Sequence, residues 1–138
     1  MTRRAHPEDD IQRTVFAHIR ARGAPGLVAW HTPNGMKLGG KRNLKGIAIQ
    51  GARLKGLGVR AGVADIIAVH AGKIYALELK APGGRATESQ LEFITDIGRA
   101  GGFTCVAEGL DHAIAVLERW GLLRGQAQSS ASKKEAAS

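Results

Sequence analysis

Three charged residues stand at the ends of the two most strand-like segments of the sequence. Asp65 opens the run DIIAV, and Glu78 and Lys80 close the run IYALELK. Side chains alternate between the two faces of a strand, so Glu78 and Lys80 share a face, about 6.6 Å apart along the strand. A short turn at Ala71-Gly72 would join the runs as an antiparallel hairpin in which facing residue numbers sum to about 143. This arithmetic predicts that Asp65 lies opposite Glu78.

Two carboxylates in cross-strand contact repel each other, and a divalent cation between them reverses the sign of that interaction. Mg²⁺ prefers oxygen ligands and retains several waters, so an oxygen-rich set favours Mg²⁺ or Mn²⁺ over Zn²⁺. Lys80 can position an attacking water or stabilise the charge that develops on a phosphate. The three residues therefore predict phosphodiester hydrolysis. The alternative is that Asp65 and Glu78 lie in solvent at strand ends, with Lys80 as their ion-pair partner.

Composition limits the class of protein and its partners. A chain of 138 residues forms one domain, and 20 Lys and Arg against 12 Asp and Glu give a net charge of +8. Such a charge favours a polyanionic partner, most often nucleic acid, although scattered surface lysines or a ribosomal association would also give it. The single cysteine, Cys105, excludes an intramolecular disulfide and a cysteine-type zinc cluster. We find no membrane-length apolar run and no signal-peptide pattern, and therefore expect a cytoplasmic protein.

The order of the expected elements predicts an α/β fold with a mixed sheet flanked by helices. Hydrophobic periodicity and turn residues place the helices over about 7–22, 88–100 and 110–123, and the strands over 27–32, 63–70, 73–80 and 103–108. Thr87 and Gln90 have the spacing of a capping box at the start of the second helix. We expect that helix to turn Leu91, Ile94, Ile97 and Gly98 inward.

Residues 35–62 form a glycine-rich basic segment without a single carboxylate. Positive charge and a flexible backbone suit contact with phosphates, and a weak helical pattern covers residues 43–58. The glycine and lysine spacing does not match a nucleotide-binding P-loop. The candidates for contacts with the nucleic-acid backbone are Lys41, Arg42, Lys45, Arg53, Lys55 and Arg60. Residues 125–138 lack apolar periodicity and are predicted to be a disordered tail.

The stretch GVADIIAVHAGKIYALELKAPGGRATESQ resembles the core of the virus-type replication-repair nuclease (VRR-NUC) domain, a branch of the PD-(D/E)xK nuclease superfamily. PEDDIQ near the N-terminus and HTPNG before the basic segment extend the resemblance over most of residues 6–110. It implies a restriction-endonuclease-like core of order αβββαβ within a domain of residues 1–124. It also implies a Mg²⁺-dependent (or Mn²⁺-dependent) DNA endonuclease. By analogy with stand-alone members, the protein would be a homodimer that cuts branched DNA such as a Holliday junction.

The resemblance assigns roles to individual residues. Asp65 and Glu78 match the metal-binding carboxylates, the Leu79 carbonyl completes the protein ligands, and Lys80 matches the catalytic lysine. Gln90 matches a helix glutamine that orients the lysine or a metal-bound water. Gln90 also belongs to the capping box, and we expect one side chain to satisfy both roles only in part.

Three further positions near the expected site carry open assignments. Glu8 matches a first-helix glutamate that reaches the metal directly or through water, yet an acidic residue in a first turn also suits the helix dipole. Ala64 replaces the proline of the family pattern, which shapes the backbone and supplies no ligand. His31 lies beside the expected cleft, where it could contact a phosphate.

Two other classes of function compete with a structure-specific nuclease. A non-catalytic module could keep the nuclease fold and only bind nucleic acid, but it would have no reason to retain Asp65, Glu78 and Lys80. A sequence-specific restriction-type endonuclease would need base-reading elements, and little chain is available for them outside residues 35–62.

Overall fold

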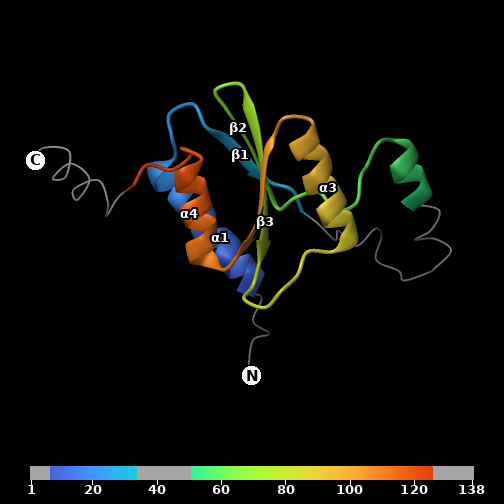
Figure 1. The fold of residues 1–138 in the computed structure, drawn as a ribbon, viewed down its shortest axis with the longest axis horizontal. Coiled ribbons are helices and arrows are strands. Elements are labelled where there is room, and N and C mark those ends of the chain that lie inside the picture. The colour runs from blue at the N-terminus through green and yellow to red at the C-terminus, as the bar shows by residue number, and fades with distance from the viewer. Residues whose placement is uncertain (1–6, 34–50, 126–138) are drawn as a thin grey trace, which may run out of the picture.

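A four-stranded mixed sheet lies between helices on both of its faces (Figure 1). The computed structural model describes residues 7–33 and 51–125 of the chain. The expected phosphate contacts of Lys41, Arg42 and Lys45 lie outside these residues, as does the tail from residue 126. The described part of the basic segment includes helical residues 51–56, within the range where a helix was expected.

The strands are β1 (Val28–His31), β2 (Ile66–His70), β3 (Lys73–Lys80) and β4 (Phe103–Glu108). They are arranged in the order β1-β2-β3-β4, with antiparallel β1/β2 and β2/β3 pairs and a parallel β3/β4 pair. Ala71 and Gly72 form the hairpin turn with φ angles of 50° and 78°, as a turn that matches the strand twist requires. Ile66 faces Leu77, so the register predicted from the length of this turn is confirmed.

The two faces of β3 belong to separate hydrophobic clusters. Tyr75, Leu77 and Leu79 pack into the larger core, beneath α1 (Pro7–Arg22) and α4 (Leu110–Arg119). Ala76, on the opposite face, packs into a smaller cluster beneath α3 (Glu88–Arg99). Glu78 and Lys80 are two and four residues after Ala76 in the strand. They therefore point to the same face as Ala76, toward α3.

Helix α3 begins where the capping box predicted, but its inward face is rotated from the expected one. Leu91 is 49% exposed and Gly98 is also exposed, so their inward assignment was wrong. Phe93 is buried instead, with Ile94 and Ile97 packed beside it. The spacing 90, 93, 94, 97 forms one continuous helical stripe, and it turns Gln90 toward the sheet together with the apolar residues.

A buried ion pair joins α1 to the C-terminal part of the domain. Arg22 is 6% exposed and donates to Glu118 Oε2 at 2.9 Å, to the Arg124 carbonyl, and to His18 Nδ1 at 3.1 Å. These partners satisfy a guanidinium that would otherwise be costly to bury. None of the helices in the described ranges is long and apolar enough to cross a membrane.

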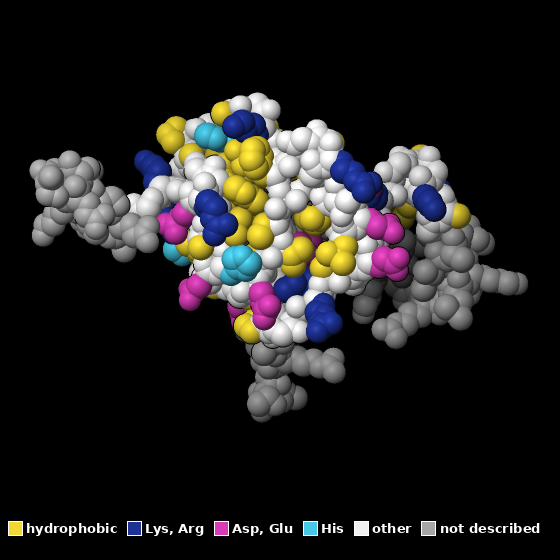
Figure 2. Space-filling view, in the orientation of Figure 1, with side chains coloured by type: hydrophobic (Ala, Val, Ile, Leu, Met, Phe, Trp, Pro, Cys, Tyr) yellow, Lys and Arg dark blue, Asp and Glu magenta, His cyan; other side chains and the backbone are white. Residues whose placement is uncertain are grey.

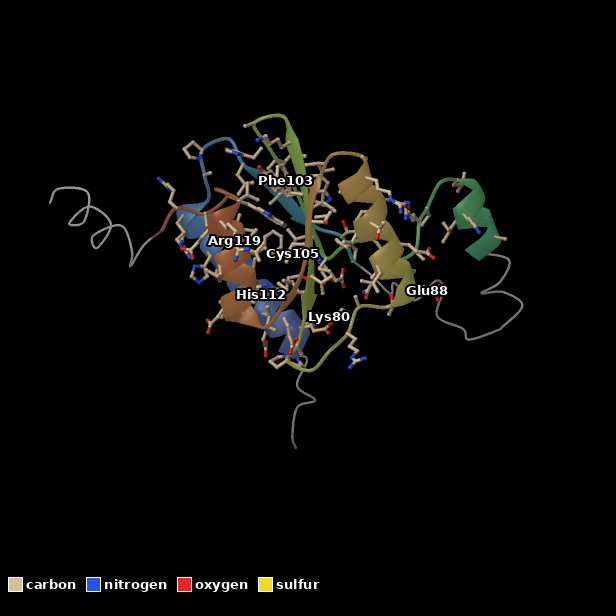
Figure 3. All side chains as sticks on the ribbon, in the orientation of Figure 1. Lys80, Glu88, Phe103, Cys105, His112 and Arg119 are labelled. Atoms are coloured by element: carbon tan, nitrogen blue, oxygen red, sulfur yellow. The ribbon has the colours of Figure 1, made fainter. Side chains whose placement is uncertain are left out.

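Cys105 is half-buried in β4, where it packs against the larger core (Figure 3). Burial raises the pKa of its thiol, and the nearby Arg119 opposes that shift. The side chain therefore acts as a small hydrophobe.

Candidate active site

The ends of β2 and β3 bring Asp65 and Glu78 together. Asp65 directly precedes β2, and the register that pairs Ile66 with Leu77 continues to this next pair. The Asp65 N–H donates to Glu78 Oε2 at 3.2 Å, and the Leu79 N–H donates to Asp65 Oδ2 at 2.8 Å. Each carboxylate is therefore held by the backbone of the other strand end, and the predicted juxtaposition is confirmed.

Glu78 and Lys80 are buried in spite of their charges. Glu78 is 1% exposed and Lys80 is 8% exposed, so neither lies in solvent at a strand end. Lys80 Nζ lies 3.5 Å from Glu78 Oε1. Figure 3 shows Lys80 near the end of β3, on the side where α3 begins at Glu88. Buried charges need close partners, and the two residues provide part of that compensation for each other.

Gln90 connects the first turn of α3 to this carboxylate. Its Nε2 donates to Glu78 Oε1 at 2.7 Å, while its Oε1 accepts from the Thr87 N–H at 2.7 Å. Thr87 Oγ1 accepts from the Gln90 N–H at 3.3 Å, which completes the capping box. The two ends of the Gln90 side chain are divided between two partners, because its NH₂ group bonds to Glu78 and its carbonyl oxygen serves the cap. Its role in orienting Lys80 or a metal-bound water stays a prediction. The capping box thus fixes the side chain that orients Glu78.

The pKa of Glu78 is raised from its usual value of 4.5 to about 7. Burial is the largest cause and the charge of Asp65 is the next, while Lys80 lowers the pKa and only partly offsets them. When Asp65 and Glu78 are both ionised, Lys80 therefore compensates only part of their negative charge. A divalent cation shared by the carboxylate oxygens would supply that charge, so the donor set fits Mg²⁺ or Mn²⁺.

Gly62 lets the segment before Asp65 pass against the first turn of α3. Its φ is +78°, and a Cβ at this position would lie 2.3 Å from the Ser89 carbonyl carbon and 2.6 Å from the Gln90 nitrogen. A backbone neighbour cannot move aside as the end of a flexible side chain can. Gly62 therefore allows the approach that seats Gln90 beside Glu78.

We expect Gly62→Ala to lower the free energy of unfolding by roughly 2 kcal/mol more than Gly121→Ala, because only the first change also creates a clash. Gly121 is a matched control, since its φ is +76° and nothing lies within 4 Å of a Cβ built there. Urea unfolding of the two variants measures the difference. Equal losses of unfolding free energy in the two variants would show that the clash of an alanine Cβ with α3 has no energetic cost.

The carbonyl of Asp65 is fixed from β1. It accepts from the Thr32 N–H at 2.9 Å and bonds to His31 Nδ1 at 2.7 Å. A carbonyl can only accept, so Nδ1 carries the proton in this contact. The sequence pointed to His31 only as a phosphate contact. The role seen here depends on the β1/β2 pairing, which joins segments 34 residues apart.

The structure does not bring all of the predicted site residues together. Glu8 lies exposed in the first turn of α1, which packs on the larger core, whereas Glu78 faces α3. Within residues 7–33 and 51–125, no three His, Cys, Asp or Glu side chains form a group that could hold a metal ion. Glu8 therefore does not join Asp65 and Glu78 in such a group, and its role as a ligand stays a prediction.

The described candidates for phosphate contacts have different surroundings. Arg53 and Lys55 are exposed on helical residues 51–56. Arg60 is already engaged, because its Nη2 lies 2.5 Å from Asp96 Oδ2 and its guanidinium lies 5.3 Å from the centre of the Phe93 ring. These contacts tie the end of the basic segment to α3. A phosphate would have to approach Arg60 beside the carboxylate of Asp96, whose charge repels it.

The mixed sheet with helices on both faces, and with charged residues at the end of its central hairpin, defines a restriction-endonuclease-like α/β fold. Among solved structures, the chain is similar to a protein described as a VRR_NUC domain protein. The two share 24% sequence identity over 85% of this chain and 89% of that chain, with a TM-score of 0.63. A scan against protein-family models and a search of curated proteins gave no match. The structural likeness confirms the fold that the sequence motifs predicted.

Proposed function

We propose that this protein is a metal-dependent deoxyribonuclease that hydrolyses phosphodiester bonds at Asp65, Glu78 and Lys80. The observation that carries the proposal is a buried glutamate bonded to the backbone of a second carboxylate residue, with a lysine 3.5 Å from one of its oxygens. The excess of basic residues suits a nucleic-acid substrate. The name of the similar VRR_NUC domain protein supports the same class of activity.

Asp65, Glu78 and the Leu79 carbonyl are the groups that would hold Mg²⁺ or Mn²⁺. When bound, the cation polarises a phosphate oxygen and makes a coordinated water more acidic. Hydrogen bonds within the protein position the two carboxylates. The Leu79 N–H donates to Asp65, and Gln90 donates to Glu78. The Lys80 ammonium orients the attacking water by hydrogen bonding, and its charge stabilises the phosphate as negative charge develops.

The proposed substrate is branched DNA, with a Holliday junction as the leading candidate. A four-way junction offers two symmetric strands to cut, so a homodimer would place one site on each strand. This part of the proposal extends the resemblance of the motifs to stand-alone VRR-NUC domains.

An exposed apolar row on the sheet supports the proposed homodimer. Val28 faces Val69, and Val69 faces Ile74, across β1, β2 and β3, with Trp30 two residues further along β1. These four side chains are 38% to 58% exposed. Strand β1 is at an edge of the sheet, where a second copy can cover both the open edge and the row.

We expect Val28→Lys to weaken self-association at least about tenfold, since burying an unpaired ammonium costs more than the roughly 1.4 kcal/mol that tenfold requires. Sedimentation equilibrium should give the wild type twice its monomer mass of 14.6 kDa. Leu91→Lys, at another exposed apolar residue, should remain a dimer. A monomeric wild type, or equal effects of the two variants, would remove this surface from the proposal.

Cleavage of labelled four-way junction, flap, single-stranded and duplex DNA tests the function, with Mg²⁺, Mn²⁺ or EDTA. Paired symmetric nicks in the junction alone, lost in EDTA, are the expected result. Cleavage of flaps or of every substrate would keep the nuclease and remove the junction preference. Tight binding without cleavage in either metal would favour the non-catalytic module.

A further inference from the structure

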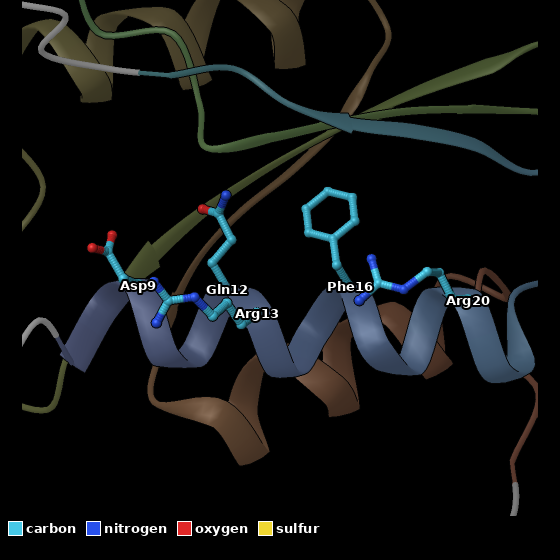
Figure 4. A pocket seen from close by; sticks show the side chains of 5 residues that line it. All are labelled: Asp9, Gln12, Arg13, Phe16 and Arg20. Atoms are coloured by element: carbon cyan, nitrogen blue, oxygen red, sulfur yellow. The ribbon is translucent and has the colours of Figure 1, made fainter.

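A hollow of about 280 Å³ follows one face of α1 (Figure 4). The lining residues recur three or four positions apart, which places them in one stripe along the helix. Figure 4 shows Gln12 and Phe16 pointing toward the strands, while the two arginines lie along the helix. The described residues that line the hollow are Asp9, Gln12, Arg13, Phe16 and Arg20.

We propose that one strand of the DNA substrate lies along this hollow, with its phosphates against Arg13 and Arg20. The inference rests on the proposed function and adds a path for the substrate that neither the basic segment nor the site residues supply. Arginine suits this role, since its planar guanidinium can bind two phosphate oxygens at once. The Gln12 amide, half-buried in the same stripe, can donate to the strand from the side of the sheet.

The charge along the hollow changes from acidic at the N-terminal end of α1 to basic toward Arg20. Within the described residues Arg20 has no ion-pair partner, whereas Arg13 pairs with Asp10 at 3.1 Å. Both members of that pair are more than 70% exposed, so exchanging Asp10 for a phosphate costs Arg13 little. Asp9 lies at the N-terminal end with Glu8 and Asp10. Phosphates are therefore favoured toward the Arg20 end and repelled from the acidic end.

The acidic end of the hollow is the end that lies beside the C-terminal end of β3. Helix α1 packs against β3, and Figures 1 and 4 both show its N-terminal half beside the end of that strand. A strand held by the arginines would thus lead toward the end of β3, where Glu78 and Lys80 project on the opposite, α3 side of the sheet. Carboxylates near that point repel a phosphate unless a cation accompanies it.

The spacing of the two arginines fits a nucleic-acid strand. Seven residues of α-helix advance about 10 Å, so Arg13 and Arg20 can each bind a different phosphate of the same strand. Figure 2 shows Lys and Arg mixed with acidic side chains on another view of the surface, so the basic residues visible there do not form one continuous track.

Fluorescence anisotropy of a labelled four-way junction and a labelled duplex, in EDTA to prevent cleavage, tests the inference. Arg20→Gln and Arg13→Gln should each weaken binding about tenfold near 0.1 M salt. Each should also reduce the slope of log K against log salt by about 0.9, as the loss of one phosphate contact does on duplex DNA. Arg99→Gln, an exposed arginine in the last turn of α3, is the matched control and should bind as the wild type does. Circular dichroism checks that each variant is folded.

Cleavage by Glu78→Gln, measured in parallel, separates the two proposals. If this variant loses cleavage while both α1 variants bind with wild-type affinity and salt slope, the hollow is not the DNA path and the nuclease stands. If all three arginine variants weaken binding equally, the effect is one of net charge and the inference is also wrong. A wild type that does not bind DNA overturns both proposals.

Discussion

Replacing Glu78 with glutamine is expected to lower metal-dependent DNA cleavage by about a thousandfold and to leave the fold intact. The substitution keeps the shape of the side chain and removes its negative charge. Cation-assisted stabilisation of a reacting phosphate is worth several kcal/mol, and roughly 4 kcal/mol corresponds to three decades in rate. Glu78 is the appropriate position, because its oxygens contact Lys80, Gln90 and the Asp65 N–H within one buried cluster.

The control for Glu78→Gln is a glutamate that lies on the same side of the sheet and takes no part in the site. Glu92 is exposed on α3, and Glu92→Gln makes the same chemical change there. Single-turnover cleavage of the preferred substrate at saturating Mg²⁺ gives the rate of each variant. Glu92→Gln should match the wild type. A Glu78→Gln protein that cleaves at the wild-type rate would contradict the proposed site.

Lys80→Met should lower the same rate by a factor of about 10² to 10³, the range for loss of one group that stabilises developing charge. Methionine retains most of the aliphatic length that Lys80 buries at the end of β3. Loss of cleavage together with retained DNA affinity would show that the ammonium acts on the reaction and not on binding.

The local part of this site could be predicted from the sequence, because short-range geometry determines it. A two-residue turn sets the β2/β3 register, and that register places Asp65 against Glu78. Strand alternation then puts Lys80 on the face of Glu78. The capping box identified the start of α3 for a similar reason, since the residues that form it are three positions apart.

The remaining contacts depend on how distant segments pack. Gln90 reaches Glu78 only because α3 is rotated to bury Phe93 in place of Leu91, and helical periodicity alone allowed either face. His31 reaches the Asp65 carbonyl through the β1/β2 pairing across the basic segment. Gly62 is one of many glycines in its segment, and among those that the structure describes it alone lies against another backbone, that of Ser89.

The raised pKa of Glu78 predicts that this carboxyl group makes the domain less stable as the pH rises. Its pKa is 4.5 in an unfolded chain and about 7 in the folded protein. Between these values the folded state holds a proton that the unfolded state has released, so the free energy of unfolding falls with increasing pH. The loss amounts to roughly 3 kcal/mol and is complete above about pH 7. Burial and the charge of Asp65 are its main physical causes.

Comparing wild type with Glu78→Gln cancels the contributions of titrating groups outside the cluster of Asp65, Glu78 and Lys80. In EDTA the difference in unfolding free energy between the two proteins should shift by roughly 3 kcal/mol in favour of the variant as the pH rises from 4 to 8. Above pH 7, Mg²⁺ or Mn²⁺ should stabilise the wild type and have much less effect on the variant, because a ligand that binds only the folded state raises its stability. Parallel pH profiles would contradict the raised pKa, and equal stabilisation of both proteins by the cation would place its binding elsewhere. The same negative charge thus weakens the cation-free fold and provides the attraction for the cation that cleavage requires.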